Sequence, residues 1–249
     1  RMRRYAGFYM GEDQDAPNYD PEHRLIRSVM TGSRGPVLRK TTPIVWGGVP
    51  FECEGRFDPL RWHRTWNDYV EHFKSYQDVT GDTPCNLIVT VMALNAYLFS
   101  GEKKYRNWIL EYVDAWVERT RENEGIIPSN IGLDGTIGGG CDGRWWGGVY
   151  GWDHKAFFRG LAPYGFGNAL LVSGDQRYVD AWRSTIRAVN AQSKEIDGIL
   201  QYPQRYGNNG WYDYSSEPFD HGALEIFYWS MDDQDQPLAR RNPWASYLL

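Results

Sequence analysis

The chain of 249 residues is poor in the side chains that build metal centres and disulfide frameworks. Its three cysteines and five histidines show no zinc-ligand spacing, and three cysteines allow at most one disulfide bond within the chain. Gly138-Gly139-Gly140 lacks the lysine of a phosphate-binding loop. The sequence therefore predicts no metal site and no bound cofactor.

Long apolar runs and clustered positive charge are also absent. No stretch approaches the run of about 20 apolar residues that spans a bilayer. The formal net charge is −5, whereas a nucleic-acid surface needs clustered lysine and arginine. We therefore expect neither a membrane span nor a nucleic-acid partner.

The sequence says little about location or assembly. The chain begins at Arg1 rather than at methionine, which slightly favours a secreted or periplasmic protein whose signal peptide has been removed. Localisation is otherwise undetermined, and no feature indicates the oligomeric state.

Aromatic residues are abundant, with 12 Trp, 17 Tyr and 10 Phe among the 249 residues. Their rings bury large areas in a core, and exposed rings offer flat apolar faces that suit the C–H surface of a pyranose. Both uses are open at this point.

A repeat with an offset of 73 residues runs through the chain. Ser100-Gly101-Glu102-Lys103-Lys104-Tyr105 recurs as Ser173-Gly174-Asp175-Gln176-Arg177-Tyr178, and Gly125-Ile126-Ile127 recurs as Gly198-Ile199-Leu200. Self-similarity at a fixed offset indicates stacked supersecondary units.

Each unit is predicted to be a helical hairpin. Residues 84–99 are apolar nearly all round, which is typical of a buried helix, and residues 103–122 carry an apolar stripe with charges opposite. The second copy predicts helices at 156–172 and 176–194. Residues 66–76 and 221–231 are expected to form further helices.

These hairpins predict an all-α fold, an (α/α) toroid of repeated helical hairpins that is incomplete in this chain. Residues 61–249 would form the partial ring. Residues 1–60, rich in proline, glycine and charge, would form an irregular N-terminal arm or cap.

The hairpin pattern, the glycine-rich loop at 125–139 and the sequence Trp145-Trp146-Gly-Gly-Val-Tyr-Gly-Trp152 give the chain a family resemblance. It resembles the (α/α)-toroid carbohydrate-active enzymes, which include many glycoside hydrolases and polysaccharide lyases. The resemblance implies an enzyme that acts on an oligo- or polysaccharide. No single family's catalytic motif is matched, so no catalytic residue is carried over.

The first long loop, residues 130–155, places acidic and aromatic side chains among nine glycines. Glycine lets a backbone approach a ligand closely, which favours a cleft, whereas an ordered Ω-like loop would pack its tryptophans into the ring. The candidates for catalysis here are Asp134 and Tyr150. Those for substrate binding are Arg144, Trp145, Trp146 and Trp152.

Two Asp-His pairs, Asp153-His154 and Asp220-His221, stand directly before predicted buried helices. Aspartate is a favoured N-cap, so each acid has a structural explanation. Histidine exchanges protons near neutral pH, and His154 and His221 are therefore candidate catalytic residues, although a lone histidine is more often structural.

The second long loop, residues 195–220, offers Tyr212 and Asp213 for catalysis and Arg205, Trp211 and Glu217 for substrate binding. Tyrosine beside arginine suits β-elimination on a uronate, and paired carboxylates suit hydrolysis. The structural alternative is a surface crossover loop whose aromatic side chains pack on the ring. We expect the two loops to converge at the starts of the buried helices.

The sequence thus favours an enzyme that cleaves glycosidic bonds by hydrolysis or β-elimination, with uronate-containing saccharides among its candidate substrates. The alternative is a non-catalytic helical-repeat module that binds glycan or protein. An enzyme acting on terpene-like apolar substrates is a third, weaker hypothesis.

Overall fold

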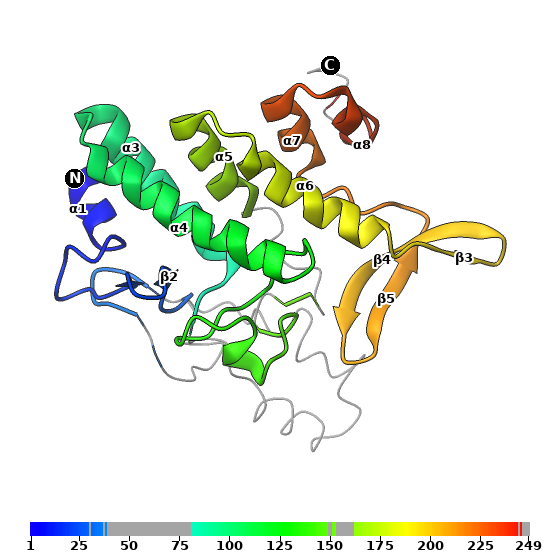
Figure 1. Cartoon of the computed structure of the whole chain (residues 1–249), viewed down its shortest axis with the longest axis horizontal. Helices are drawn as coiled ribbons and strands as arrows, with labels where there is room; N and C mark the ends of the chain where they lie inside the picture. Colours follow the sequence, from blue (N-terminus) through cyan, green and yellow to red (C-terminus); the bar gives the residue numbers. More distant parts are fainter. Residues whose placement is uncertain are drawn as a thin grey trace.

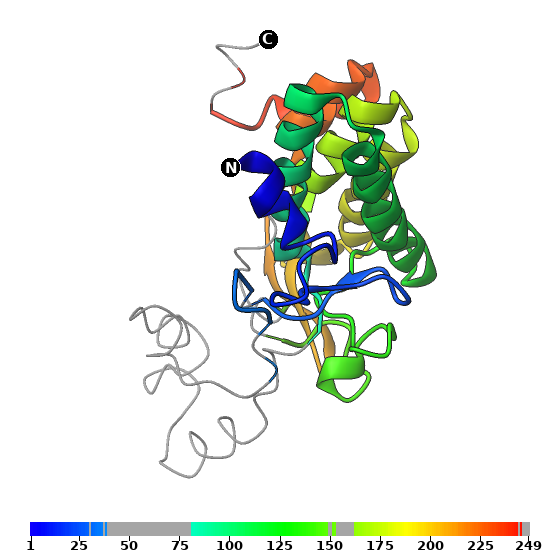
Figure 2. The ribbon, with the colours of Figure 1, turned by 90° about the vertical axis from the view of Figure 1, so that its left-hand side faces the viewer.

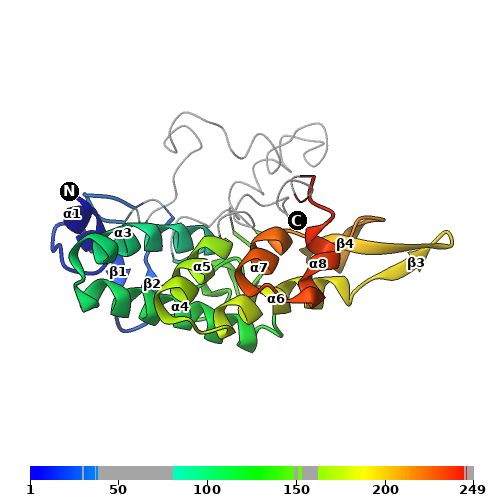
Figure 3. The same cartoon turned by 90° about the horizontal axis from the view of Figure 1, so that it is seen from above.

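The computed structural model describes residues 1–29, 31–36, 38, 81–148, 151–152, 162–243 and 245. The helices of this part of the chain lie in two layers (Figures 1 and 3). One layer contains α1 (Met2–Gly7), α3 (Thr90–Ser100), α5 (Ala162–Ser173) and α7 (Ala223–Ser230). The other contains α4 (Lys103–Glu122) and α6 (Arg177–Asn190).

Short elements connect these helices. The 3₁₀-helices are η3 (Pro84–Val89), η4 (Gly139–Cys141) and η6 (Asp233–Asp235), and the last described helix is α8 (Gln236–Ala239). No helix among the described residues has the length and apolar character needed to cross a membrane.

The predicted all-α toroid is wrong, because the described residues also form two antiparallel sheets. One pairs β1 (Tyr19–Asp20) with β2 (Leu25–Ile26). The other has the order β3 (Lys194–Ile196), β4 (Ile199–Gly207) and β5 (Gly210–Ser215). Here the sequence contained a strand pattern that the helical repeat obscured.

Turn residues explain why β3, β4 and β5 form where a crossover loop was expected. Asp197 and Gly198 both adopt left-handed conformations, with φ of 53° and 74°. Asp-Gly in this conformation is the favoured two-residue connection of a β-hairpin. The second helix of this unit therefore ends at Asn190 rather than at residue 194, and residues 194–196 pair with β4 instead.

The predicted hairpins α3–α4 and α5–α6 are confirmed, and their turns are built alike. Ser100 Oγ and Ser173 Oγ each accept a hydrogen bond from the backbone N–H two residues later, at 3.2 and 3.1 Å. Gly101 and Gly174 end α3 and α5 with φ of 68° and 76°. Residues 66–76 and 156–161, for which helices were also predicted, lie outside the described residues.

The 73-residue offset also holds for burial. Tyr105 and Tyr178 are both completely buried, and so are nearly all of Trp108 and Ala181, which are 5% and 8% exposed. Equivalent residues of the two hairpins are therefore buried alike. The repeat is therefore structural and not a coincidence of composition.

A third copy of the turn follows α7 and was not found from the sequence. Ser230-Met231-Asp232 takes the place of Ser173-Gly174-Asp175, and the Asp232 N–H donates to Ser230 Oγ at 3.1 Å. Met231 ends α7 with φ of 51°, although the first two copies have glycine there. The third hairpin is α7–α8, whose second helix has only four residues.

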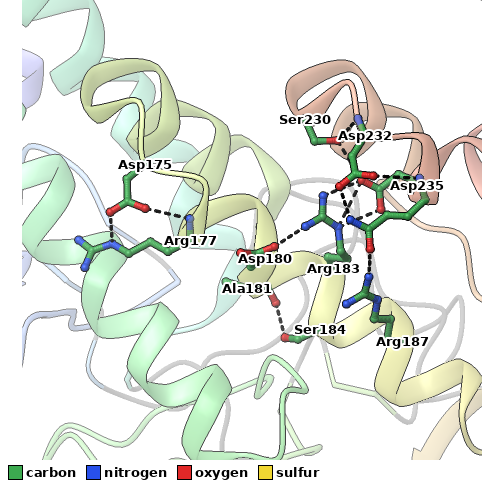
Figure 4. A network of polar contacts seen from close by, with 11 residues as sticks. Asp175, Arg177, Asp180, Ala181, Arg183, Ser184, Arg187, Ser230, Asp232 and Asp235 are labelled. Carbon is green, nitrogen blue, oxygen red and sulfur yellow. Dashed lines mark hydrogen bonds and ion pairs between the residues drawn. The ribbon is translucent and has the colours of Figure 1, made fainter.

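An ion pair holds this third hairpin against α6 (Figure 4). Arg183 of α6 donates to both carboxylate oxygens of Asp235, with Nη2 2.7 Å from Oδ2, and both side chains are largely buried. Ser230 Oγ donates to Asp235 Oδ2 at 2.9 Å. The acidic run at 232–235 is thus partly an internal anchor.

The N-terminal segment packs on α3 and α4 (Figure 2). Tyr19 lies edge-on to Trp108 with ring centroids 5.5 Å apart, and its hydroxyl donates to Glu111 at 2.7 Å. Arg119 of α4 donates to the backbone oxygens of His23 and Arg24 at 2.6 and 3.3 Å.

Asp82 is the buried junction between this segment, η3 and α4. Its carboxylate accepts hydrogen bonds from the Ile26 N–H at 3.0 Å, the Asn86 amide at 2.8 Å and the Tyr112 hydroxyl at 3.2 Å. Its own backbone pairs with Ile131 through two hydrogen bonds of 2.8 and 2.9 Å. Three segments distant in sequence therefore depend on one carboxyl group.

Burial raises the pKa of Asp82 from the ordinary 3.8 to about 6, against the lowering effect of its N–H donors and Arg119. Between pH 4 and 6 the folded protein therefore keeps a proton that the unfolded chain has released. The contribution of Asp82 to the free energy of unfolding is fully present below about pH 4. It is lost as the pH rises through 6, by about 3 kcal/mol.

We predict that Asp82→Asn removes this pH dependence. Urea unfolding at several pH values between 4 and 7 should show the wild-type stability, relative to Asp82→Asn, falling as the pH rises. The exchange of an acceptor for an amide adds an offset that is independent of pH. Asp134→Asn serves as the control, because hydrogen bonds from Thr136 lower the pKa of that exposed carboxyl. A constant difference for Asp82→Asn would contradict the prediction.

We also predict that Met231→Gly stabilises the protein by up to about 1 kcal/mol, because a left-handed residue without a Cβ is unstrained. Gly101→Ala, whose Cβ would meet no atom within 4 Å, should lower the stability by a similar amount through backbone strain alone. Thermal unfolding of the two variants provides the measurement. A loss of stability in Met231→Gly would show that the turn carries no strain.

Candidate functional site

The two long loops identified in the sequence meet in the structure. The Tyr206 N–H donates to the Trp152 carbonyl at 3.1 Å, which joins β4 to the end of the first loop. The ring of Tyr206 lies 4.7 Å from Trp145, 5.2 Å from Trp146 and 4.9 Å from Trp211 between centroids. We call Trp145, Trp146, Trp152, Tyr206, Trp211 and Phe219 the aromatic cluster.

Polar side chains at the start of the first loop hold its tryptophans in place. Ser129 Oγ donates to the Trp145 carbonyl at 2.8 Å and also to the Gly147 carbonyl. The Asn130 amide donates to the carbonyls of Arg144 and Gly147 at 2.9 and 3.0 Å. Both side chains are buried, so the bonds are shielded from water.

Trp152 is the support of the cluster and not a contact surface. It is completely buried, and its indole N–H donates to the Ile127 carbonyl at 2.8 Å. Trp211 and Phe219 pack against it with centroids 5.9 and 5.6 Å away. Trp152, predicted to bind substrate, is therefore placed as a buried support of the cluster.

Four rings of the cluster remain partly exposed: Trp145, Trp146, Tyr206 and Trp211. They come from two separate loops, and Trp145 and Trp211 rest on the buried ring of Trp152. Each of these four rings contacts at least one other. The result is an ordered aromatic surface that solvent reaches.

Arg205 and Asp213 form a pair on the neighbouring strands. Arg205 Nε lies 3.0 Å from Asp213 Oδ2, an ion pair whose alignment is not that of a hydrogen bond. Arg205 is opposite Tyr212 in the register, whereas Tyr206 is opposite Trp211. Because strand residues alternate between faces, Arg205 and Tyr212 point away from the side that Tyr206 and Trp211 share.

Asp213 is strained as well as paired. Its φ is 57° in the middle of β5, where an extended conformation is expected. Left-handed geometry at a non-glycine residue costs about 1 kcal/mol or more and is frequent at functional sites. The carboxylate of Asp213 therefore already has a charged partner on the neighbouring strand.

Asp134 lies with the N-terminal segment and not with the aromatic cluster. Its Oδ1 accepts hydrogen bonds from the Thr136 N–H and hydroxyl at 3.1 and 2.7 Å. A Cβ added to neighbouring Gly135 would lie 2.9 Å from His23 Cδ2. Asp134 therefore shapes a turn beside His23, and no contact brings it to the tryptophans.

Two other predicted binding residues have partners outside the cluster. Glu217 pairs with Arg241 near the end of the chain. Arg144 donates to the Cys141 carbonyl at 2.9 Å, and its guanidinium lies 3.6 Å from the carboxylate of Asp142. The latter pair is well exposed, which makes it weak.

Asp220 and His221 lie next to Phe219 of the aromatic cluster. The His221 ring is exposed and stands 5.1 Å from the Phe219 ring, and its carbonyl accepts the Trp182 indole N–H at 2.8 Å. Gly222 is the N-cap of α7 and makes no side-chain cap, so the capping role considered for Asp220 is wrong. Burial raises the pKa of Asp220 instead.

The glycines of the first loop serve close backbone packing. A Cβ at Gly138 would lie 2.6 Å from the Gly143 carbonyl carbon, and one at Gly139 would collide with the Thr136 hydroxyl. Loop compactness therefore explains these residues without a ligand. Tyr150, Asp153 and His154 lie outside the described residues, so the predicted meeting of His154 with His221 is not addressed.

The family of the chain follows from its sequence similarity. Residues 1–198 match the family described as Domain of unknown function (DUF8034). The chain belongs to this family. No curated protein and no solved structure is significantly similar to it.

The matched region contains only half of the aromatic cluster. Trp145, Trp146 and Trp152 lie within it, whereas Tyr206 and Trp211 lie beyond residue 198. Sequence reasoning had assigned a role in the site to all of these except Tyr206, which together with Phe219 completes the cluster. The strand alternation of β4, had it been recognised, would have placed Tyr206 on the same face as Trp211.

The described residues do not bring three His, Cys, Asp or Glu side chains together as metal ligands. Among the described residues, the cluster and its surroundings offer aromatic faces, backbone carbonyls and the Asp220-His221 pair.

Proposed function

We propose that this protein binds a saccharide on the partly exposed rings of the aromatic cluster. The observation that carries the proposal is the convergence of Trp145 and Trp146 with Tyr206 and Trp211 from two separate loops, at centroid distances near 5 Å. Flat apolar faces with a polar edge suit the C–H faces and hydroxyl rim of a sugar.

Preorganisation supports the same proposal. Ser129 and Asn130 fix the backbone that bears Trp145 and Trp146, and Trp152 supports both loops from below. Rings that are already ordered lose little conformational entropy on binding. Folding alone would not require these aromatic rings to be exposed to solvent.

A second candidate function is cleavage of the bound saccharide, and Asp220 is the observation that favours it. A carboxyl whose pKa is raised by burial retains its proton at higher pH, which suits a general acid at a glycosidic oxygen. It adjoins Phe219 of the cluster. Asp213 and Glu217 are less suited because each already lies in an ion pair with an arginine, and neither is buried.

We predict that the binding of oligosaccharides depends on Trp146 and Trp211. Calorimetric titration with neutral and uronate-containing oligosaccharides should yield one class that binds, and Trp146→Ala or Trp211→Ala should weaken it roughly 5- to 30-fold. Tyr5→Ala, which alters an exposed ring on α1, is the matched control and should leave the affinity unchanged. Equal losses in all three variants, or no binding in the panel, would refute the proposal.

Cleavage is tested on any polysaccharide that binds. Reducing ends without unsaturated products indicate hydrolysis, and ultraviolet absorbance of unsaturated products indicates elimination. If Asp220 is the general acid, Asp220→Asn should lower turnover by about 10²- to 10⁴-fold with unchanged affinity. Full turnover in Asp220→Asn would remove Asp220 from the mechanism, and the protein would remain a binding module if no substrate is cleaved.

A further inference from the structure

One face of the layer that contains α3, α5 and α7 is apolar and open to solvent. Large side chains on these helices are unusually exposed: Met92 36%, Leu98 65%, Phe99 80%, Tyr164 45%, Leu171 67% and Tyr228 59%. We call these six residues the apolar face. The described helices that pack on α3, α5 and α7 lie beside them or in the other layer (Figures 1 and 3).

The exposed positions are in register across the three helices. The turns at Ser100, Ser173 and Ser230 set the alignment, because they share the same hydrogen bonds. Counted from these serines, Leu98, Leu171 and Tyr228 are equivalent, and so are Asn95, Asn168 and Glu225. Two parallel rows therefore cross the helices, one apolar and one polar.

Charge is nearly absent from these three helices. α3 and α5 contain no charged residue, and Glu225 is the single one in α7. By contrast, α4 and α6 carry numerous lysine, arginine, aspartate and glutamate side chains toward solvent. A face without charge meets a copy of itself without repulsion, which a patch of one sign could not do.

The exposed apolar area approaches that of a small stable interface. With about 150–200 Å² for each of the six side chains, three of which are aromatic, these exposures present on the order of 500–700 Å². A standard interface buries about 800 Å² on each partner. Monomeric proteins rarely expose a contiguous apolar patch larger than a few hundred Å².

We infer that the apolar face is the interface between two copies of this chain, related by a two-fold axis that runs along α5. This axis places α3 of one copy against α7 of its partner and keeps the rows in register. Leu98 then packs on Tyr228 of the partner subunit, and the two Leu171 side chains meet near the axis. The inference does not depend on the proposed saccharide surface, which other elements form.

The polar row fits the same arrangement. Asn95 uses one amide N–H for the Val91 carbonyl at 2.8 Å, and Asn168 uses one for the Thr90 hydroxyl at 2.8 Å. Each amide therefore keeps a second N–H and its oxygen. Asn95 can donate to Glu225 of the partner subunit, and the two Asn168 amides can bond to each other across the axis.

The first experiment measures the mass of the protein in solution by sedimentation velocity between about 1 and 100 µM, a range that resolves micromolar dissociation constants. We expect a dimer. Leu98→Glu and Leu171→Glu each place two unpaired charges in the interface and should raise the dissociation constant by at least about 100-fold. Ile199→Glu, at a residue of β4 that is 55% exposed, is the matched control and should leave it unchanged.

Circular dichroism will show whether the variants are folded. We expect them to fold, because the substituted positions are exposed. A wild-type protein that is monomeric throughout the range would overturn the inference. So would an equal loss of dimer in Ile199→Glu, because the effect would then come from added charge in general.

The second experiment tests the two-fold axis. Asn95→Asp places a like charge opposite Glu225 of the partner subunit and should weaken the dimer about tenfold or more. Adding Glu225→Gln removes the repulsion and should restore the dissociation constant to within about threefold of the wild type. Failure of this rescue would overturn the pairing of α3 with α7.

Discussion

The structure depends on the buried carboxyl group of Asp82. It accepts hydrogen bonds from the N-terminal strand, from η3 and from α4, and its backbone pairs with Ile131. The backbones of Gly81 and Ile131 lie close together, since a Cβ at Gly81 would lie 2.1 Å from the Ile131 oxygen. A buried polar group that satisfies several segments at once fixes their relative positions, because each donor left unpaired would carry a desolvation penalty.

The aromatic cluster is connected to Asp82 through a few neighbouring residues of the chain. Ile131 is anchored by Asp82, and the adjacent Ser129 and Asn130 hold the backbone of Trp145 and Gly147. Ile127, at the other side of Ser129, receives the indole N–H of Trp152. The rings that we propose to contact a saccharide are thus tied to the buried core, which is how a loop becomes a preorganised surface.

The two helical layers differ in how their solvent-facing sides are composed. α4 and α6 are amphipathic, with a buried stripe and a charged outer face, so they are complete when water covers one side. α3, α5 and α7 bury one side in the core and expose large apolar side chains beside a polar row on the other. The hairpin repeat that stabilises the fold therefore also creates the surface that we assign to a second copy.

Local sequence was sufficient to identify the two hairpins, their turns and the burial of Tyr105 and Tyr178, because helical periodicity and turn chemistry act between near neighbours. It also identified the two loops that meet. It did not reveal the β-sheet, since Gly125-Ile126-Ile127 and Gly198-Ile199-Leu200 match in sequence but not in structure. Pro128 and the hydroxyl of Thr185 hold the first copy as a buried loop, whereas the second continues into β4. The tertiary structure alone decided which carboxylates pair with an arginine, as Asp213 does with Arg205 and Asp235 with Arg183. Packing selects the partner of a charge, and sequence spacing does not.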